Sequence, residues 1–156
     1  MSRQPPPDER GIALALALFA LVVIGALVSG SFFAGWLEQQ SGQNTMFAAQ
    51  ALEAAEAGLS DVLANADPAA VEALPIGGLA LDLGTLTPGT GVTAARQIIR
   101  LTSSLFFVRS TGIRRNADGN PLATRSLGLL VRVVPAAGAV PVRLSPVGER
   151  AWVQLW

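Results

Sequence analysis

The feature that most constrains this chain is an uncharged apolar stretch close to its N-terminus. The residues from Gly11 to Leu37 include no charged side chain. As an α-helix this stretch would be about 40 Å long, whereas the hydrocarbon core of a bilayer is about 30 Å thick. The sequence therefore predicts a helix over residues 12–37 that is long enough to span a membrane with some tilt.

A second, amphipathic helical segment follows without a break. No proline occurs between Glu38 and Asn65, and apolar residues recur there at steps of three and four. This spacing places them on one face of a helix; they are Phe47/Ala48, Leu52, Ala55, Leu59 and Val62/Leu63. We expect one helix from about Ile12 to Asn65, with residues 38–66 as its amphipathic continuation. The three prolines within Met1–Arg10 predict that these residues stay outside the helix.

The rest of the chain predicts a small antiparallel sheet. Asp67-Pro68 ends the helix, and Asp67 can cap a short following turn of helix that has Pro68 in its first position and continues over residues 69–74. Residues 67–95 are expected as a loop region, because Pro75–Gly91 is rich in Gly, Pro and Thr, with one short strand at residues 79–83. Residues 96–156 are expected to form the sheet, giving an α+β arrangement in which the long N-terminal helix packs on the strands.

Particular strands can be placed within this sheet. Runs of β-branched and aromatic residues predict strands at residues 98–101, 104–113 and 127–134. Asp118-Gly119 indicates a hairpin turn between the last two. Residues 142–144 and 152–156 are expected as edge strands. Core packing is expected to cover Trp152 and Trp156, with a contact to another subunit as the alternative.

The amino-acid composition excludes several classes of chemistry. The chain has no cysteine and no histidine. Disulfides, thiolate nucleophiles, Cys/His zinc sites and histidine proton transfer are therefore excluded. Glu53 and Glu56 lie three residues apart on the predicted helix, as an acid/base pair would, but no nucleophile or phosphate-loop motif accompanies them. We expect no enzyme activity, no cofactor and no metal.

The charges are sorted along the chain although the formal net charge is zero. Residues 38–82 carry acidic and no basic side chains, whereas nine of the 11 basic residues are arginines between Arg96 and Arg150. A compositional preference for arginine explains this without any function. The functional alternative is a phosphate-binding patch for nucleic acid around the predicted hairpin, built from Arg109, Arg114, Arg115 and Arg125.

Small residues suggest that the apolar helix can pack against other helices. Ala26, Gly30 and Ala34 are spaced four apart and share one helical face, and Leu16 is a further residue expected in helix packing. Such a face lets a second helix approach closely in a membrane. The same residues could also be incidental in a single-pass anchor, and small residues at 28–31 leave a conventional signal-peptide cut conceivable.

Three segments together resemble the PilX-type minor pilins of type IV pilus assembly. Glu9-Arg10-Gly11 before Ile12-Ala13-Leu14 resembles the leader that prepilin peptidase cuts after glycine. The segment from Phe47 to Leu59, FAAQALEAAEAGL, resembles the A-x-x-A-A-E-A-G-L signature of these pilins. The strand opening Val108–Gly112 is similar to the strand that follows in the same family.

The resemblance implies a structural role and a pilin-like fold. Residues 1–11 would be a leader, Gly11 its last residue and Ile12 the methylated first residue of the mature chain. The implied partners are other pilins or pseudopilins, prepilin peptidase, an inner-membrane assembly platform and membrane lipid. The chain would first be a single-pass inner-membrane protein with its C-terminal part in the periplasm, and later part of an extracellular or periplasmic filament.

One position departs from the family pattern. Major pilins carry Glu at the fifth mature position, which here is Leu16. In such families this Glu pairs with a neighbour's N-terminus inside an apolar filament core, where an unpaired amine is costly. The departure favours a priming or tip subunit. The alternative function is a single-pass anchored or secreted β-domain that binds a partner such as DNA.

Overall fold

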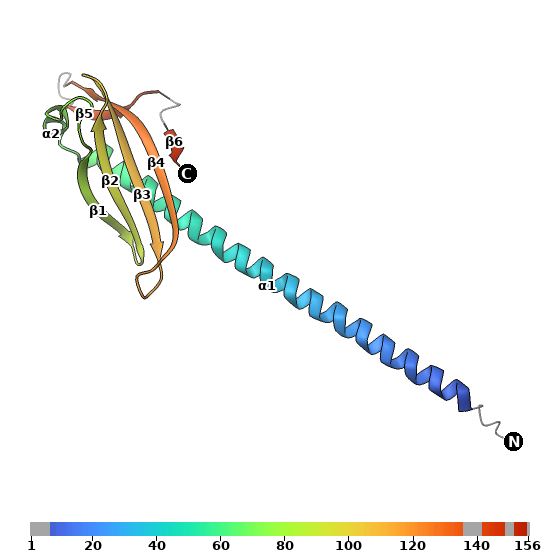
Figure 1. The fold of residues 1–156 in the computed structure, drawn as a ribbon. Helices are drawn as coiled ribbons and strands as arrows, with labels where there is room; N and C mark the ends of the chain where they lie inside the picture. Colours follow the sequence, from blue (N-terminus) through green and yellow to red (C-terminus); the bar gives the residue numbers. More distant parts are fainter. Residues whose placement is uncertain (1–6, 136–141, 149–151, 156) are drawn as a thin grey trace. The chain divides into compact units, whose positions relative to one another are not determined.

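The computed structural model describes residues 7–135, 142–148 and 152–155. Its architecture is α+β, as predicted: a long N-terminal helix and a small antiparallel sheet. The elements are α1 (Pro7–Asn65), α2 (Pro68–Glu72), β1 (Leu81–Gly89), β2 (Val92–Arg100), β3 (Leu105–Arg115), β4 (Pro121–Val134), β5 (Arg143–Pro146) and β6 (Trp152–Leu155). Figure 1 shows these elements along the chain.

The chain divides into two compact units, which we describe separately. The N-terminal unit is Met1–Gln43 and the C-terminal unit is Asn44–Trp156. The N-terminal unit contains the first part of α1, which is helical from Pro7 onward. The prediction that Met1–Arg10 stay outside the helix was therefore wrong for Pro7–Arg10, and residues 1–6 lie outside the described residues. Proline is tolerated in the first turn, because the amide hydrogen that it lacks would have no partner there.

In the C-terminal unit, the second part of α1 crosses one face of the sheet (Figure 1). Of the predicted stripe, Ala55, Leu59 and Val62 are buried and Leu52 is half-buried, and Ala51, which was not part of the predicted stripe, is buried as well. They pack with side chains from four strands and from α2: Val71, Ile98, Phe106, Val108, Leu127, Leu129, Val131 and Leu144. Burial of these apolar groups is the main force that holds the helix on the sheet.

The sheet is antiparallel, with the strand order β1-β2-β3-β4-β5. Both β5 and β6 pair with β4. Strand β5 pairs with residues 131–134 of β4, and β6 pairs with residues 126–129 of the same strand. The β3–β4 hairpin turns at the predicted place, where Gly119 has a φ of 85° and the Asn116 amide donates to the Asn120 carbonyl at 2.9 Å. Along β3, Phe106, Val108 and Ser110 are buried and Arg109 is exposed. The predicted alternation on this strand is therefore confirmed.

The region predicted as a loop holds more regular structure than expected. It contains β1, and β2 begins at Val92, so the sheet starts well before residue 96. A register irregularity between Asp82 and Thr85, together with Gly84 at a φ of 78°, interrupts the two-residue periodicity of β1. Because of this bulge, Leu83 and Leu86 are both half-buried although they lie three residues apart.

Two further details concern α2 and the C-terminal strand. As predicted, the Asp67 carboxylate caps α2 by accepting a hydrogen bond from the Ala69 amide at 3.0 Å. The prediction that the core covers Trp152 was wrong, since 48% of this residue is exposed. β6 lies on the edge of the sheet, where a side chain has neighbours on one side only. Trp156 lies outside the described residues.

Candidate functional site

The most distinctive surface of the N-terminal unit is the apolar part of α1. Every residue from Gly11 to Gln43 is exposed, and the most apolar window of the helix has a mean hydropathy of 2.9 with none of it buried. Large side chains such as Phe19, Val22 and Phe32 are each at least two-thirds exposed. An α-helix of this kind satisfies its own backbone hydrogen bonds, so it is compatible with a single membrane span.

The few polar groups in this segment suit an apolar environment. The Ser31 hydroxyl donates to the Leu27 carbonyl at 3.0 Å, one turn earlier. This bond removes the cost of leaving a hydroxyl without a partner in lipid. At the end of the segment, the rings of Phe33 and Trp36 lie 6.1 Å apart. Tryptophan is enriched where membrane-spanning helices meet the headgroup layer.

The residues predicted to pack against other helices are all available for contact. Leu16 is 63% exposed, and Ala26, Gly30 and Ala34 are also exposed. A methyl group added to Gly30 would meet no atom within 4 Å. Nothing in the described chain occupies this face. Gly11 and Ile12, the predicted processing residues, lie within α1, and Ile12 is exposed.

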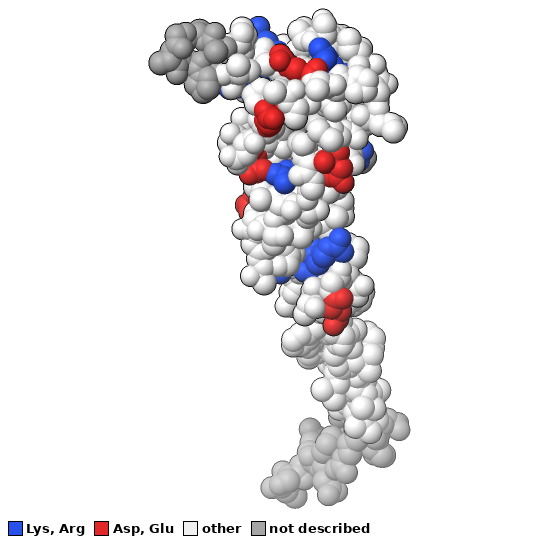
Figure 2. Space-filling view, turned by 90° about the vertical axis from the view of Figure 1, so that its left-hand side faces the viewer, with Lys and Arg blue, Asp and Glu red and all other residues white. Residues whose placement is uncertain are grey.

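The four arginines predicted as a nucleic-acid patch do not share one face. Successive strand residues point to opposite faces, so Arg109 and Arg114 on β3 lie on different sides of the sheet. Arg125 is paired with Gly112 and so lies on the side of Arg114. Figure 2 shows one face of the molecule, where basic side chains alternate with acidic ones among uncharged residues.

Several arginines instead donate hydrogen bonds to backbone carbonyls. Arg114 donates to the Thr90 carbonyl at 2.8 Å, and Arg115 donates to the Gly119 carbonyl at 2.9 Å. Arg100 donates to the Leu74 carbonyl at 3.1 Å and the Ser103 carbonyl at 2.7 Å, and also to the Glu72 carbonyl. These contacts hold loops and turns in place, a role that the sequence reasoning did not assign to arginine.

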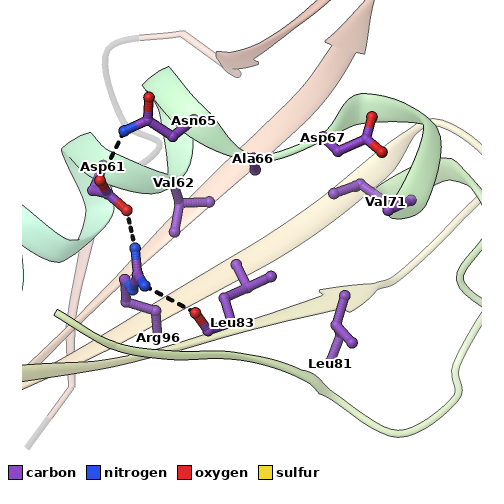
Figure 3. Close-up of a pocket in the computed structure, with 10 residues that line it drawn as sticks. Asp61, Val62, Asn65, Ala66, Asp67, Val71, Leu81, Leu83 and Arg96 are labelled. Atoms are coloured by element: carbon purple, nitrogen blue, oxygen red, sulfur yellow. Dashed lines mark hydrogen bonds and ion pairs between the residues drawn. The ribbon is translucent and has the colours of Figure 1, made fainter.

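An ion pair that the sequence analysis did not foresee borders a cavity in the C-terminal unit (Figure 3). The cavity has a volume of about 390 Å³. Arg96 on β2 forms an ion pair with Asp61 on α1, and it also donates to the Leu83 carbonyl at 2.9 Å. Asn65 donates to the other oxygen of Asp61 at 2.8 Å. Val62, Val71, Leu81 and Leu83 give the cavity apolar walls.

This ion pair joins α1 to β2. The charges of Arg96 and Asp61 neutralise each other, and their side chains are only 15% and 24% exposed, respectively. Among the described residues no group of three or more acidic side chains could hold a metal ion. Glu53 and Glu56, the pair considered as acid and base, are exposed. The pairing of Asp61 with Arg96 could not be read from sequence, because 35 residues separate them.

No protein-family model, curated protein or solved structure matches this chain.

Proposed function

We propose that this chain is a structural subunit of a pilin-like filament, held in the inner membrane by the apolar part of α1 before assembly. The single observation that carries the proposal is the composition of α1. An exposed, uncharged helix continues as an amphipathic helix that packs on an antiparallel sheet. Such a helix can be surrounded by lipid or by the apolar helices of other subunits.

The resemblance of residues 10–59 to PilX-type minor pilins gives the proposal its detail. Prepilin peptidase would cut after Gly11, and Ile12 would become the methylated N-terminus. With Leu16 in place of the Glu of major pilins, the new amine would have no carboxylate partner in the apolar core of a filament. This favours a priming or tip position, in a pilus or in a secretion pseudopilus.

The proposal is tested by the mature N-terminus. The full chain is expressed together with a prepilin peptidase, recovered from the membrane fraction and analysed by mass spectrometry. We expect a chain that begins at methylated Ile12. Gly11→Leu should block the cut, whereas the matched variant Gly25→Leu should leave it unchanged. An uncut chain, or a cut near Ser31, would overturn the proposal.

Membrane insertion is tested separately. Ile24 lies in the middle of the apolar segment, and an arginine there costs about 2.5–3.5 kcal/mol on insertion scales. Ile24→Arg should therefore shift the chain from the alkali-resistant membrane fraction to the soluble or aggregated fraction. Gln39→Arg adds the same charge beyond the segment and should leave the distribution unchanged. Equal behaviour of the two variants would contradict a membrane-spanning role for this helix.

A further inference from the structure

The two edges of the sheet are connected by one row of directly paired residues. The strand register aligns Leu81 on β1 with Trp152 on β6, through Ile98, Val108 and Leu129 on the strands between them. The three central residues belong to the core that α1 covers, so this row lies on the α1 side of the sheet. Figure 1 shows β1 and β6 on opposite sides of the sheet. Leu81 and Trp152 therefore lie at the same level along the strands, one at each edge.

At the β6 end of this row, Trp152 presents a large apolar surface. This residue is 48% exposed, and the neighbouring Val153 is 39% exposed. Tryptophan is enriched among the residues that dominate the energy of protein–protein contacts, because its ring buries a large area when it enters a pocket. The β6 edge therefore offers an anchor of the kind that protein interfaces use.

At the β1 end of the same row, Leu81 lines the cavity that the ion pair between Asp61 and Arg96 borders (Figure 3). The cavity volume of about 390 Å³ lies within the range of about 300–1,000 Å³ that is typical of ligand pockets. Val62 and Val71 supply further apolar walls. Because the two bordering charges are paired with each other, an apolar ring can enter without leaving a buried charge alone. The cavity is therefore suited to a large apolar side chain.

A second row carries a positive charge at the same edge as Trp152. The register aligns Leu86 on β1 with Arg125 on β4, through Ala94 and Gly112. Gly112 lies against α1, so this row is also on the α1 side of the sheet. The described part of β6 pairs with β4 only as far as Ser126. Arg125 is exposed, and within the described residues it forms no ion pair.

A negative charge lies at the β1 end of this second row. Glu53 on α1 lines a hollow together with Pro88 and Gly89, which follow Leu86 closely in β1. Glu53 is exposed and, like Arg125, has no ion-pair partner in the described part of the chain. The β1 side of the unit thus combines an apolar cavity with a carboxylate, and the β6 edge combines an apolar ring with a guanidinium.

We propose that a second copy of this chain docks its β6 edge against the β1 side of the first, with Trp152 in the cavity beside Asp61 and Arg96 and with Arg125 paired to Glu53. A displacement along the two rows makes both contacts at once, because each row joins the same two edges. The contact joins unlike edges and leaves one of each free, so further copies can add in the same direction. It concerns the C-terminal unit alone and does not rest on the proposed membrane span.

The chain has no cysteine, so single introduced thiols can report which edges meet. Thr85→Cys on β1 and Val153→Cys on β6 replace exposed residues at the two edges. The full-length variants in detergent micelles are treated with a short bismaleimide, separately and as an equal mixture. We expect linked dimers in the mixture alone. Links in either variant by itself would indicate contact between like edges or association through α1 only, and no link in the mixture would show that the edges do not meet; each of these results would overturn the proposal.

Matched variants test the two contacts. Trp152→Ala in both cysteine chains should raise the protein concentration for half-maximal linking roughly tenfold. Leu122→Ala removes another exposed apolar side chain, at the start of β4, and should leave this concentration unchanged. Equal effects of the two changes would contradict the proposal.

Charge reversal separates binding from folding. Arg125→Glu should weaken the linking, because it places two carboxylates against each other. Adding Glu53→Arg to the same chains should restore the linking, which a folding defect would not allow. A double variant that links as weakly as Arg125→Glu would overturn the pairing of these edges.

Discussion

Gly112 on β3 lies directly against the backbone of Ala51 on α1. A Cβ built on Gly112 would approach the Ala51 carbonyl and the Ala55 amide more closely than real Cβ contacts allow. About two turns after Ala51 along the helix, Gly58 lies close against the side chains of Ser110 and Ala94. The helix and the sheet of the C-terminal unit therefore meet through two glycines, one on each element. This close approach lets Ala55 and Leu59 become fully buried.

The first prediction concerns this contact. Gly112→Ala should destabilise the C-terminal unit by about 1–3 kcal/mol, because a methyl group would push against helix backbone that cannot move aside. The measurement is urea denaturation of the full chain in detergent, followed by circular dichroism. Gly89→Ala is the matched control, since a Cβ there meets no atom within 4 Å and the residue also lies in a strand. An equal loss in both variants would show that the close approach is not the cause.

The second prediction concerns the ion pair between Asp61 and Arg96. Both side chains are partly buried, so their coupling should exceed that of a typical surface pair and reach about 1 kcal/mol. A double-mutant cycle with Asp61→Asn and Arg96→Met measures it from the free energies of unfolding. Glu56→Gln, an exposed carboxylate on the same helix, should change the stability little. A coupling energy near zero would contradict a role for this pair in holding β2 on α1.

The third prediction concerns Arg100, whose guanidinium contacts several carbonyls and lies 5.5 Å from the Phe106 ring centre. Arg100→Lys keeps the charge, but a single ammonium group cannot make the same set of bonds. Hydrogen exchange should therefore become faster at Gly77 and Leu101, whose amides are bonded to carbonyls in this region. Arg132→Lys, on an exposed strand position, should leave these rates unchanged. Unchanged rates in Arg100→Lys would show that the loops are held by other contacts.

Much of the fold could be predicted from local patterns. The apolar stripe on α1, the Asp67 cap and the Asp118-Gly119 turn each depend on residues close in sequence, and each was confirmed. β1 was predicted at less than its full length because its bulge breaks the alternation of apolar residues. The start of the sheet was therefore placed too late in the chain.

The polar contacts could not be predicted in the same way. The arginines were visible as a basic run, but their partners are carbonyls such as Leu83 and Thr90, and every residue has a carbonyl. Which carbonyl is reached depends on strand register and on the path of the turns. The position of Trp152 at the level of Leu81, on the opposite edge of the sheet, is likewise a property of the strand register.

The fourth prediction concerns nucleic acid. Because Arg109 lies on the opposite side of the sheet from Arg114 and Arg125, these side chains cannot contact one phosphate backbone together. We expect weak DNA binding without the steep salt dependence that several simultaneous phosphate contacts produce. The measurement is fluorescence anisotropy of a labelled duplex with the full chain in detergent, over a series of salt concentrations. Tight binding that falls steeply with salt, and that is lost in Arg109→Ala, would contradict this expectation.

The last prediction concerns the small-residue face of α1. Gly30 lies between Ala26 and Ala34, and a larger side chain there would keep a second helix at a distance. Gly30→Leu should therefore weaken self-association of the full chain in lipid vesicles roughly tenfold, measured by energy transfer between labelled copies. Gly25→Leu adds the same volume and gains similar helix propensity, but it lies about 140° away around the helix. If the two variants weaken association equally, or if neither does, the face formed by Ala26, Gly30 and Ala34 is not the contact surface between helices.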